Sequence, residues 1–280
     1  MRIDAHQHFW RYRAQDYLWI THGMAALRAD HLPTDLAPQL ARHGVDASIA
    51  VQARANEAET DFLLELAQDE ARIAGVIGWV DLRAADLPRR LARWDGAGKL
   101  KGFRHLVQDE ADASACLRCD AFNRGVAQLQ QSGNVYELLV RAPQLGAAPA
   151  FCAAHDAHWL VLDHLGKPEI GGRGDAEWQR HLAELARMPH VVCKLSGLVT
   201  ETGSRNVFDA MFYRYLDAAL ELFGAQRLLF GSDWPVCLLK ASYARVYELI
   251  EGWARRLSAS EVAAVFGGNA MRVYGLAETP

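Results

Sequence analysis

Short apolar runs rich in β-branched residues alternate along the chain with longer segments whose apolar residues recur at helical spacing. Eight of the short runs predict strands: Arg2–Gln7, Ala47–Gln52, Ile73–Val80, Gly102–Val107, Val135–Val140, Trp159–His164, Val191–Ser196 and Leu228–Asp233. The longer segments predict helices over Thr34–His43, Glu57–Asp69, Asp86–Trp94, Ala121–Gln131, Glu177–Arg187, Phe208–Phe223 and Tyr243–Leu257. Ser258 and Glu261 then have the spacing of a capping box that begins another helix. Strand and helix alternate as in parallel crossover units.

This alternation predicts an α/β fold, and the burial pattern favours one form of it. Several strands, such as VVCKLSG and RLLFGSD, are almost continuously apolar, as expected of strands covered on both faces. No Pro-, Ser- or Gly-rich linker divides the sequence. Eight units in an undivided chain favour a (β/α)8 TIM barrel over a doubly wound sheet, and we expect residues 1–280 to form a single domain. In such a barrel the active site lies at the carboxyl ends of the strands.

Histidine and aspartate residues stand at three of the predicted strand ends. His6 and His8 are two residues apart at the end of the first strand, so the period of a strand places both imidazoles on one face. His164 ends the sixth strand, and Asp233 ends the eighth directly after a buried run. A carboxylate in that position needs hydrogen bonds, a cation or a metal. Neutral imidazoles can bind a metal or hydrogen-bond a substrate carbonyl.

Other side chains are candidate substrate contacts. Arg104 and His105 end the fourth strand, where a guanidinium suits a carboxylate or hydroxyl oxygens; for Arg104 a structural ion pair is the alternative. Lys194 on the seventh strand either contacts substrate or pairs with a neighbouring acid. Tyr136 is a further candidate whose facing a one-residue slip would reverse. Trp10, with other aromatic residues of the first loop, either binds substrate or belongs to a lid packed on the barrel rim.

The composition narrows the class of partner. Of 280 residues, 51% are hydrophobic and 23% charged, which fits a large core and excludes a disordered or fibrous chain. A formal net charge of −4 provides no basic field for nucleic acid or for an anionic membrane, so we expect a small-molecule partner. The polar start MRIDAHQHFW predicts no signal peptide, and no apolar run is long enough to span a membrane. The five cysteines favour a reducing compartment, the cytoplasm.

Four motifs together resemble a known family. DAHQHFW, VLDHLGKP, GSDWPV and GGNAMRVYGL, in this order, resemble the amidohydrolase superfamily in its second amidohydrolase group. The similarity covers essentially the whole chain and is greatest to the sugar-lactone and 2-pyrone-4,6-dicarboxylate lactonases of that group. The resemblance implies a distorted (β/α)8 barrel in which His6, His8, His164 and Asp233 form the active-site set.

The resemblance also bears on metal content. Binuclear members carry a carboxylated lysine or a glutamate near the fourth strand and a histidine on the fifth, whereas this chain has Arg104 and Tyr136 in those regions. The resemblance therefore implies at most one divalent ion, expected to be zinc, held by His6, His8 and Asp233, with His164 as a further candidate ligand. Lactonase-like relatives often work without any metal.

The expected reaction is hydrolysis of a sugar (aldono) lactone to its acid, which makes the protein a hydrolase of carboxylic ester bonds. Asp233 would accept a proton from water while His6, His8 or His164 stabilises the oxyanion. A dicarboxylate lactone would require several arginines at the mouth, and only Arg104 is a firm candidate. The first alternative is a metal-dependent decarboxylase of an unsaturated or aromatic acid. Two further alternatives are a metal-dependent phosphodiesterase and a non-catalytic barrel that only binds a sugar acid or a metal.

Overall fold

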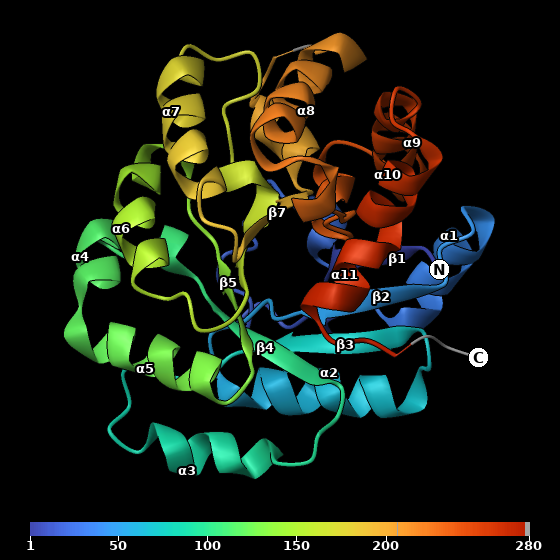
Figure 1. Cartoon of the computed structure of the whole chain (residues 1–280). Helices are drawn as coiled ribbons and strands as arrows, with labels where there is room; N and C mark the ends of the chain where they lie inside the picture. Colours follow the sequence, from blue (N-terminus) through green and yellow to red (C-terminus); the bar gives the residue numbers. More distant parts are fainter. Residues whose placement is uncertain (206, 278–280) are drawn as a thin grey trace.

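Eight parallel strands form one sheet that closes on itself, and Figure 1 shows them in a computed structural model with the helices around them. The structure describes residues 1–205 and 207–277. The sheet closes where the Asp233 N–H donates to the His6 carbonyl at 2.8 Å and the His8 N–H donates to the Trp234 carbonyl at 2.7 Å. The strands pair in chain order: β1 (Ile3–Gln7), β2 (Ala47–Val51), β3 (Ile73–Gly78), β4 (Leu100–His105), β5 (Val135–Leu138), β6 (Leu160–Leu162), β7 (Val191–Leu195) and β8 (Leu228–Phe230). The predicted (β/α)8 barrel is confirmed.

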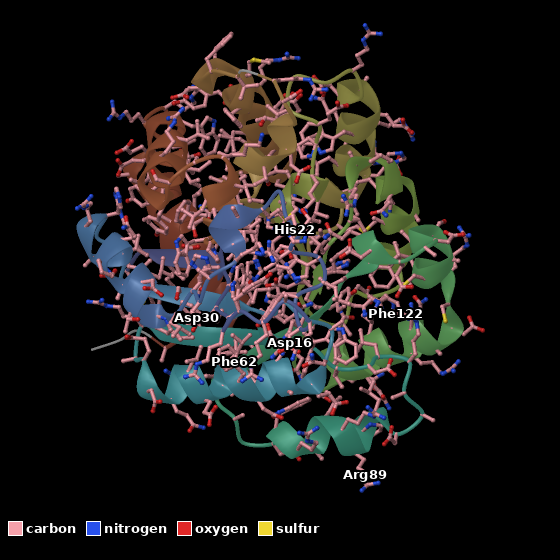
Figure 2. The ribbon with its side chains drawn as sticks, turned by 180° about the vertical axis from the view of Figure 1, so that it is seen from behind. Asp16, His22, Asp30, Phe62, Arg89 and Phe122 are labelled. Atoms are coloured by element: carbon pink, nitrogen blue, oxygen red, sulfur yellow. The ribbon has the colours of Figure 1, made fainter. Side chains whose placement is uncertain are left out.

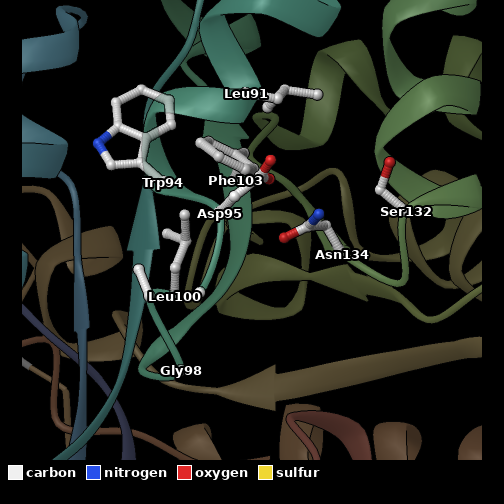
Figure 3. Close-up of a pocket in the computed structure, with 10 residues that line it drawn as sticks. Leu91, Trp94, Asp95, Gly98, Leu100, Phe103, Ser132 and Asn134 are labelled. Atoms are coloured by element: carbon white, nitrogen blue, oxygen red, sulfur yellow. The ribbon is translucent and has the colours of Figure 1, made fainter.

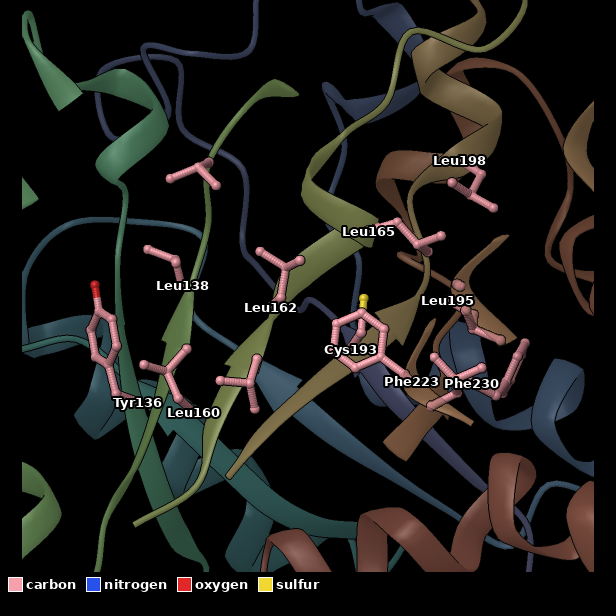
Figure 4. Packing of buried hydrophobic residues seen from close by; sticks show 14 of the residues in the cluster. Tyr136, Leu138, Leu160, Leu162, Leu165, Cys193, Leu195, Leu198, Phe223 and Phe230 are labelled. Carbon is pink, nitrogen blue, oxygen red and sulfur yellow. The ribbon is translucent and has the colours of Figure 1, made fainter. Parts of the chain in front are cut away.

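The helices cover the outside of the barrel, where outward side chains such as Leu138, Leu160 and Leu162 pack beneath them (Figure 4). No helix in residues 1–205 or 207–277 combines the length and apolar character needed to cross a membrane. The helices are α1 (Pro33–Arg42), α2 (Glu57–Asp69), α3 (Leu87–Leu91), α4 (Ala113–Arg118), α5 (Asp120–Gln131), α6 (Ala148–Ala153), α7 (Asp175–Ala186), α8 (Asp209–Phe223), α9 (Tyr243–Ala254), α10 (Ala259–Ala263) and α11 (Asn269–Val273).

The structure corrects the ends of several predicted strands. β6 ends at Leu162 and not at His164, and β8 ends at Phe230 and not at Asp233. The reason is local: His164 and Asp233 adopt left-handed φ angles of 55° and 57°, which a strand does not contain. β3 and β5 also end two residues before their predicted ends, at Gly78 and Leu138.

Some helix predictions were wrong as well. The helix predicted over Asp86–Trp94 is α3 followed by a 3-10 turn at Ala92–Trp94. The predicted helix over Tyr243–Leu257 ends at Ala254. Helices α4 and α6 were not predicted, because each has six residues and so is too short for a hydrophobic period to be recognised.

A β-bulge sets which side chains of β1 point inward. Asp4 pairs with Ser48 and Gln7 with Ala50, so β1 holds one residue more than β2 over the same stretch. Strict alternation along the strand would place the side chains of Ala5 and His6 on opposite faces of the sheet. Because of the bulge, both face the barrel interior.

The barrel interior has an apolar base and a charged layer above it. Tyr274 from the carboxyl-terminal segment closes the base. The apolar side chains of the base are Ile3, Ala5, Ile49, Ile77, Val135, Val161, Val192 and Leu229. One step nearer the carboxyl ends, Arg104, Glu137, Asp163 and Lys194 replace them, and none of the four is more than 3% exposed. The charged layer therefore forms the floor of whatever site the strand ends build.

Candidate active site

A cavity of about 320 Å³ lies at the carboxyl ends of the strands. His8, Arg104, His164 and Asp233, all predicted from strand ends, are part of its wall. Apolar side chains line another part, among them Trp19, Met24, Leu139, Val236 and Leu239. The remaining polar lining includes Gln108, Asp109, Arg141, Lys167, Thr200 and Glu201. The cavity is large enough for a small molecule and offers it both polar and apolar contacts.

Three imidazoles surround one oxygen of Asp233. Asp233 Oδ1 lies 3.4 Å from Nε2 of His8, 3.8 Å from Nε2 of His6 and 3.9 Å from Nε2 of His164. All three distances exceed a normal hydrogen bond. The groups therefore converge on a point without contacting one another directly.

The imidazoles of His8 and His164 are oriented by partners behind them. His8 Nδ1 lies 2.8 Å from the Val51 carbonyl, which only accepts, so Nδ1 carries the proton. A neutral His8 consequently presents a bare Nε2 to Asp233, and two lone pairs face each other. His164 Nδ1 lies 2.8 Å from the hydroxyl of Ser196, which can donate to it and leave a proton on Nε2. The two rings are thus suited to different roles: His8 can serve as a metal ligand through Nε2, and His164 can serve as a hydrogen-bond donor through Nε2.

An unusual backbone segment presents His164. Residues His164, Leu165, Gly166 and Lys167 have φ angles of 55°, 53°, 67° and 52°, a run of left-handed residues directly after β6. This conformation costs free energy for residues other than glycine, and residues with such strain cluster at functional sites. Gly197 accommodates the ring, since its φ is 68° and a Cβ there would lie 2.6 Å from His164 Nδ1.

Burial and neighbouring charges set the protonation of the site. Burial lowers the pKa of His164 to about 4, and burial likewise lowers the pKa of His6 well below its usual value. Burial opposes ionisation of Asp233, but the imidazoles of His164, His8 and His6 outweigh it and lower the pKa of Asp233. At neutral pH the site thus holds an ionised Asp233 beside neutral His6 and His164 rings.

The charged layer beneath the cavity pairs two cations with two acids. Asp163 accepts from Arg104 Nη1 at 2.9 Å and lies 3.4 Å from Lys194 Nζ. Lys194 also donates to Glu137 Oε1 at 2.6 Å, as does the Tyr274 hydroxyl at the same distance. Burial raises the pKa of Asp163, but Lys194, His6 and Arg104 together hold that pKa well below its usual value.

The donor set at the mouth fits a divalent ion. One ligand atom from each of His6, His8 and Asp233 lies within 4.8 Å of the others, and all three side chains are buried. The 3.4 Å separation of His8 Nε2 from Asp233 Oδ1 is close to the edge of about 3.3 Å that tetrahedral zinc with these ligands requires. Two facing lone pairs in a buried site also call for a cation between them. His6, His8 and Asp233 therefore form a group suited to one divalent metal ion.

A family model decides where this barrel belongs, because the amidohydrolase model matches residues 3–276. The chain belongs to the amidohydrolase family. This amidohydrolase is 58% identical over 288 residues to an L-fucono-1,5-lactonase from Burkholderia multivorans, an alignment that covers 99% of this chain and 97% of that protein. It is 36% identical to an L-fucono-1,5-lactonase from Burkholderia ambifaria, with coverage of 98% and 95%.

A solved structure is similar over the same length. The crystal structure of a Burkholderia multivorans amidohydrolase with bound zinc matches this amidohydrolase with a TM-score of 0.96 and 57% identity, covering 99% of this chain and 100% of that one. The zinc in that protein and the His6, His8 and Asp233 group in this chain agree on a site for one divalent ion.

Lys194 lies in the charged layer beneath the cavity of the amidohydrolase, where it pairs with the acid Glu137, and three more predicted substrate contacts also lie outside the cavity. Tyr136 points away from the barrel interior and packs against Phe122 and Phe151, because its neighbour Glu137 takes the inward position (Figure 4 labels Tyr136). His105 also points outward, where its Nε2 contacts Glu110 at 2.6 Å. Alternation along a strand explains both placements, since Arg104 takes the inward position on β4.

Trp10, the third, belongs to a packed loop over the rim. Its indole is fully buried and donates to the Ala29 carbonyl at 3.0 Å, whereas Trp19 of the same loop reaches the cavity. Polar residues of this loop face solvent, and Figure 2 labels Asp16, His22 and Asp30 among them. The lid alternative predicted for the aromatic cluster thus describes Trp10.

Several residues of the site were not predicted. Asp163 stands next to His164 in the sequence, but its role in the charged layer depends on the strand alternation of β6. Lys167 and Glu201 reach the cavity from loops, and their Nζ and Oε1 atoms are 3.8 Å apart. The DHLGKP sequence contains Lys167 and was the only available signal for it.

A second hollow lies at the opposite end of the barrel. Its volume is about 300 Å³, and Figure 3 shows Trp94, Leu100, Phe103 and Asn134 in its wall, near the start of β4. Asp95 is the one titratable residue among its described lining residues. A single exposed carboxylate offers no acid and base pair, so the cavity over Asp233 is the candidate site.

Proposed function

We propose that the protein hydrolyses the ester bond of L-fucono-1,5-lactone, or of a closely related 6-deoxy sugar lactone, to give the free sugar acid. The chain is a lactone-hydrolysing member of its family, as the L-fucono-1,5-lactonase that is 58% identical to it supports. The observation that carries the proposal is the ionised Asp233 facing the neutral imidazoles of His6 and His164 at the wall of a small-molecule cavity. A general base and a positioned donor are what ester hydrolysis requires.

Asp233 acts as the general base in this mechanism. Its carboxylate takes a proton from water as the oxygen of that water attacks the lactone carbonyl. His164 donates a hydrogen bond from Nε2 to the developing oxyanion. Its ring proton is on Nε2 because the Ser196 hydroxyl donates a hydrogen bond to Nδ1. The proton held by Asp233 then passes to the ring oxygen as the ester bond breaks. The carbonyl carbon of a lactone is more electrophilic than that of an amide. The activation barrier that these groups must lower is therefore smaller than for amide hydrolysis.

His8 serves a separate task. Because the Val51 carbonyl holds its proton on Nδ1, a neutral His8 presents an Nε2 that accepts and does not donate, so it cannot itself stabilise the oxyanion. A zinc ion, when held by His6, His8 and Asp233, would polarise the carbonyl and acidify the attacking water. The three side chains are buried and preorganised for that ligation.

The cavity wall matches the two faces of a deoxy sugar. Lys167 and Glu201 provide charged groups that hydrogen-bond ring hydroxyls. Met24, Val236 and Leu239 provide an apolar surface for the methyl group that distinguishes a 6-deoxy sugar. Because acidic as well as basic side chains line the wall, a neutral lactone suits the cavity better than a dicarboxylate.

The cysteines, the net charge and the closed sheet bear on the compartment, the partner and the domain organisation of the protein. Cys116, Cys119, Cys152, Cys193 and Cys237 are all free thiols, which supports the cytoplasm as the working compartment. The net charge of −4 supports a small-molecule partner over nucleic acid or a membrane surface. The closed sheet of eight strands supports a single catalytic domain.

A pH-indicator assay on a panel of sugar lactones tests the proposal. The panel contains L-fucono-1,5-lactone, its D-enantiomer, an L-galactono-lactone and a 2-pyrone-4,6-dicarboxylate. The L-galactono compound carries a hydroxymethyl group where the L-fucono compound carries a methyl group. We expect fastest acid release from the L-fucono compound. No acid release from any lactone, together with CO2 release from an unsaturated or aromatic acid, would support the decarboxylase instead.

A further inference from the structure

Two basic side chains flank His6, one at each ring nitrogen. Arg104 Nη1 lies 3.3 Å from Nε2 of His6, and Lys194 Nζ lies 3.2 Å from Nδ1. All three side chains are at most 3% exposed, so water does little to screen the charges. The nitrogen of His6 that faces Asp233 is the one beside Arg104.

His6 and His8 therefore differ as ligands. Metal-binding histidines usually donate their second ring N–H to a carbonyl or carboxylate, which strengthens the ligand. His8 has this arrangement, since its Nδ1 faces the Val51 carbonyl. His6 has an ammonium at Nδ1, with the Asp163 carboxylate 3.4 Å away, and a guanidinium on the side of the ion. Positive charge at that side opposes a divalent ion.

Arg104 cannot turn away from this position. Its Nη1 donates to Asp163 at 2.9 Å and its Nη2 to the Gln52 carbonyl at 2.5 Å, while Gln52 Nε2 donates back to the Arg104 carbonyl at 3.1 Å. Moving the guanidinium would leave Asp163 without that partner in a fully buried place. The guanidinium is also part of the cavity wall, beside Asp233 and His164.

We infer that Arg104 is a resident cation of the reaction centre, which weakens divalent-metal binding at His6, His8 and Asp233 and supplies positive charge to the developing oxyanion when no ion is bound. The statement on metal affinity stands on the geometry alone, and the statement on catalysis rests on the proposed function.

Zinc affinity tests the first statement without reference to activity. Competition with a chromophoric chelator gives the zinc dissociation constant of the wild type and of Arg104→Gln, which keeps a hydrogen-bond donor for Asp163 and removes the charge. We expect Arg104→Gln to bind zinc at least tenfold more tightly than the wild type. Arg104→Lys, which keeps the charge, and Arg141→Gln, which removes a more exposed cation of the same cavity, should stay within threefold. Unchanged or weaker zinc binding by a folded Arg104→Gln would overturn the inference.

Folding of each variant is checked by circular dichroism and by its urea midpoint. If Arg104→Gln does not fold, the comparison moves to Lys194→Met combined with Glu137→Gln, which removes the second cation together with its acid. That pair should tighten zinc binding by a smaller factor, since Lys194 lies on the far side of the ring. No tightening in this variant would count against the inference.

Hydrolysis of L-fucono-1,5-lactone with and without chelator tests the second statement. The chelated wild type should keep at least a third of its kcat, whereas chelated Arg104→Gln should lose more than 100-fold and recover on addition of zinc. A mere substrate contact would lower the rate by the same factor in both conditions, which would contradict the inference. Loss of all wild-type activity on chelation would contradict it too. If the wild type hydrolyses no lactone at all, the proposed function fails, and the zinc affinities still decide the first statement.

Discussion

His8 Nε2 and Asp233 Oδ1 face each other across 3.4 Å with no proton to share when His8 is neutral. The Val51 carbonyl causes this by holding the His8 proton on the opposite ring nitrogen. The pair is buried, so the two lone pairs require a cation or a bound water between them. This relationship connects the bulged first strand to the chemistry expected at the mouth.

Removal of His8 should weaken zinc binding. We expect His8→Ala to raise the zinc dissociation constant at least 100-fold, because it deletes the ligand with the best-oriented lone pair. His158→Ala is the matched control, since His158 lies just before β6 and outside the cavity lining. Equal zinc affinity in His8→Ala and the wild type would show that the ion binds elsewhere.

Ser196 should affect the rate more than substrate binding. Its hydroxyl holds His164 Nδ1 at 2.8 Å and is not part of the cavity wall. Ser196→Ala should lower kcat by about 10- to 100-fold, in the range found for residues that orient a functional histidine, while KM changes less than threefold. Steady-state kinetics on L-fucono-1,5-lactone measures both. An unchanged kcat would remove His164 from the donor role.

Lys194→Met should destabilise the protein by roughly 3 to 5 kcal/mol, because it leaves Glu137 without its buried cation and Asp163 with Arg104 as its remaining cation. Urea unfolding measures the loss. The double variant Lys194→Met with Glu137→Gln removes an acid together with the cation and should recover part of it. If the double variant is no more stable than the single one, the pairing of Lys194 with Glu137 is not what stabilises the layer.

The pKa of about 4 for His164 has a consequence for stability. An unfolded histidine binds its proton near pH 6.5, whereas the folded chain resists it, so between these values the unfolded state holds more protons. His164 thus makes the free energy of unfolding fall as pH falls from 6.5 toward 4, by up to about 1.4 kcal/mol per pH unit.

His164→Gln removes this contribution. Urea unfolding of both proteins in chelator at pH 7 and pH 5 isolates the term, since the other titrating groups are shared. The wild type should lose more stability than His164→Gln between these two values. Equal losses would mean that the His164 ring takes up its proton as readily folded as unfolded.

Much of the architecture was predictable from the sequence, because a barrel of parallel strands repeats one pattern. Every strand is covered on both faces, so each appears as an apolar run between helical segments. The same regularity predicted that His6, His8, His164 and Asp233 lie near one another, and the structure brings them together. Strand ends were less predictable, since the left-handed backbone at His164 and Asp233 leaves no mark in an apolar pattern.

The facing of individual side chains required the structure. Tyr136 and Glu137 are neighbours in the sequence, and only the register of β5 decides that Glu137 enters the charged layer while Tyr136 packs outside. Lys167 reaches the cavity through a left-handed turn that is not encoded in any hydrophobic period. Position in a strand was therefore predictable, whereas side-chain direction next to bulges and turns was not.

The rate of acid release from L-fucono-1,5-lactone by the wild type and by Asp233→Asn tests the central claim most directly. Asparagine keeps the size of the side chain and loses the base, so kcat should fall at least 1,000-fold, within the range for general bases combined with charge at the site. Binding of the product acid, measured by calorimetry, should persist and show that the cavity is intact. Undiminished turnover by Asp233→Asn would contradict the account.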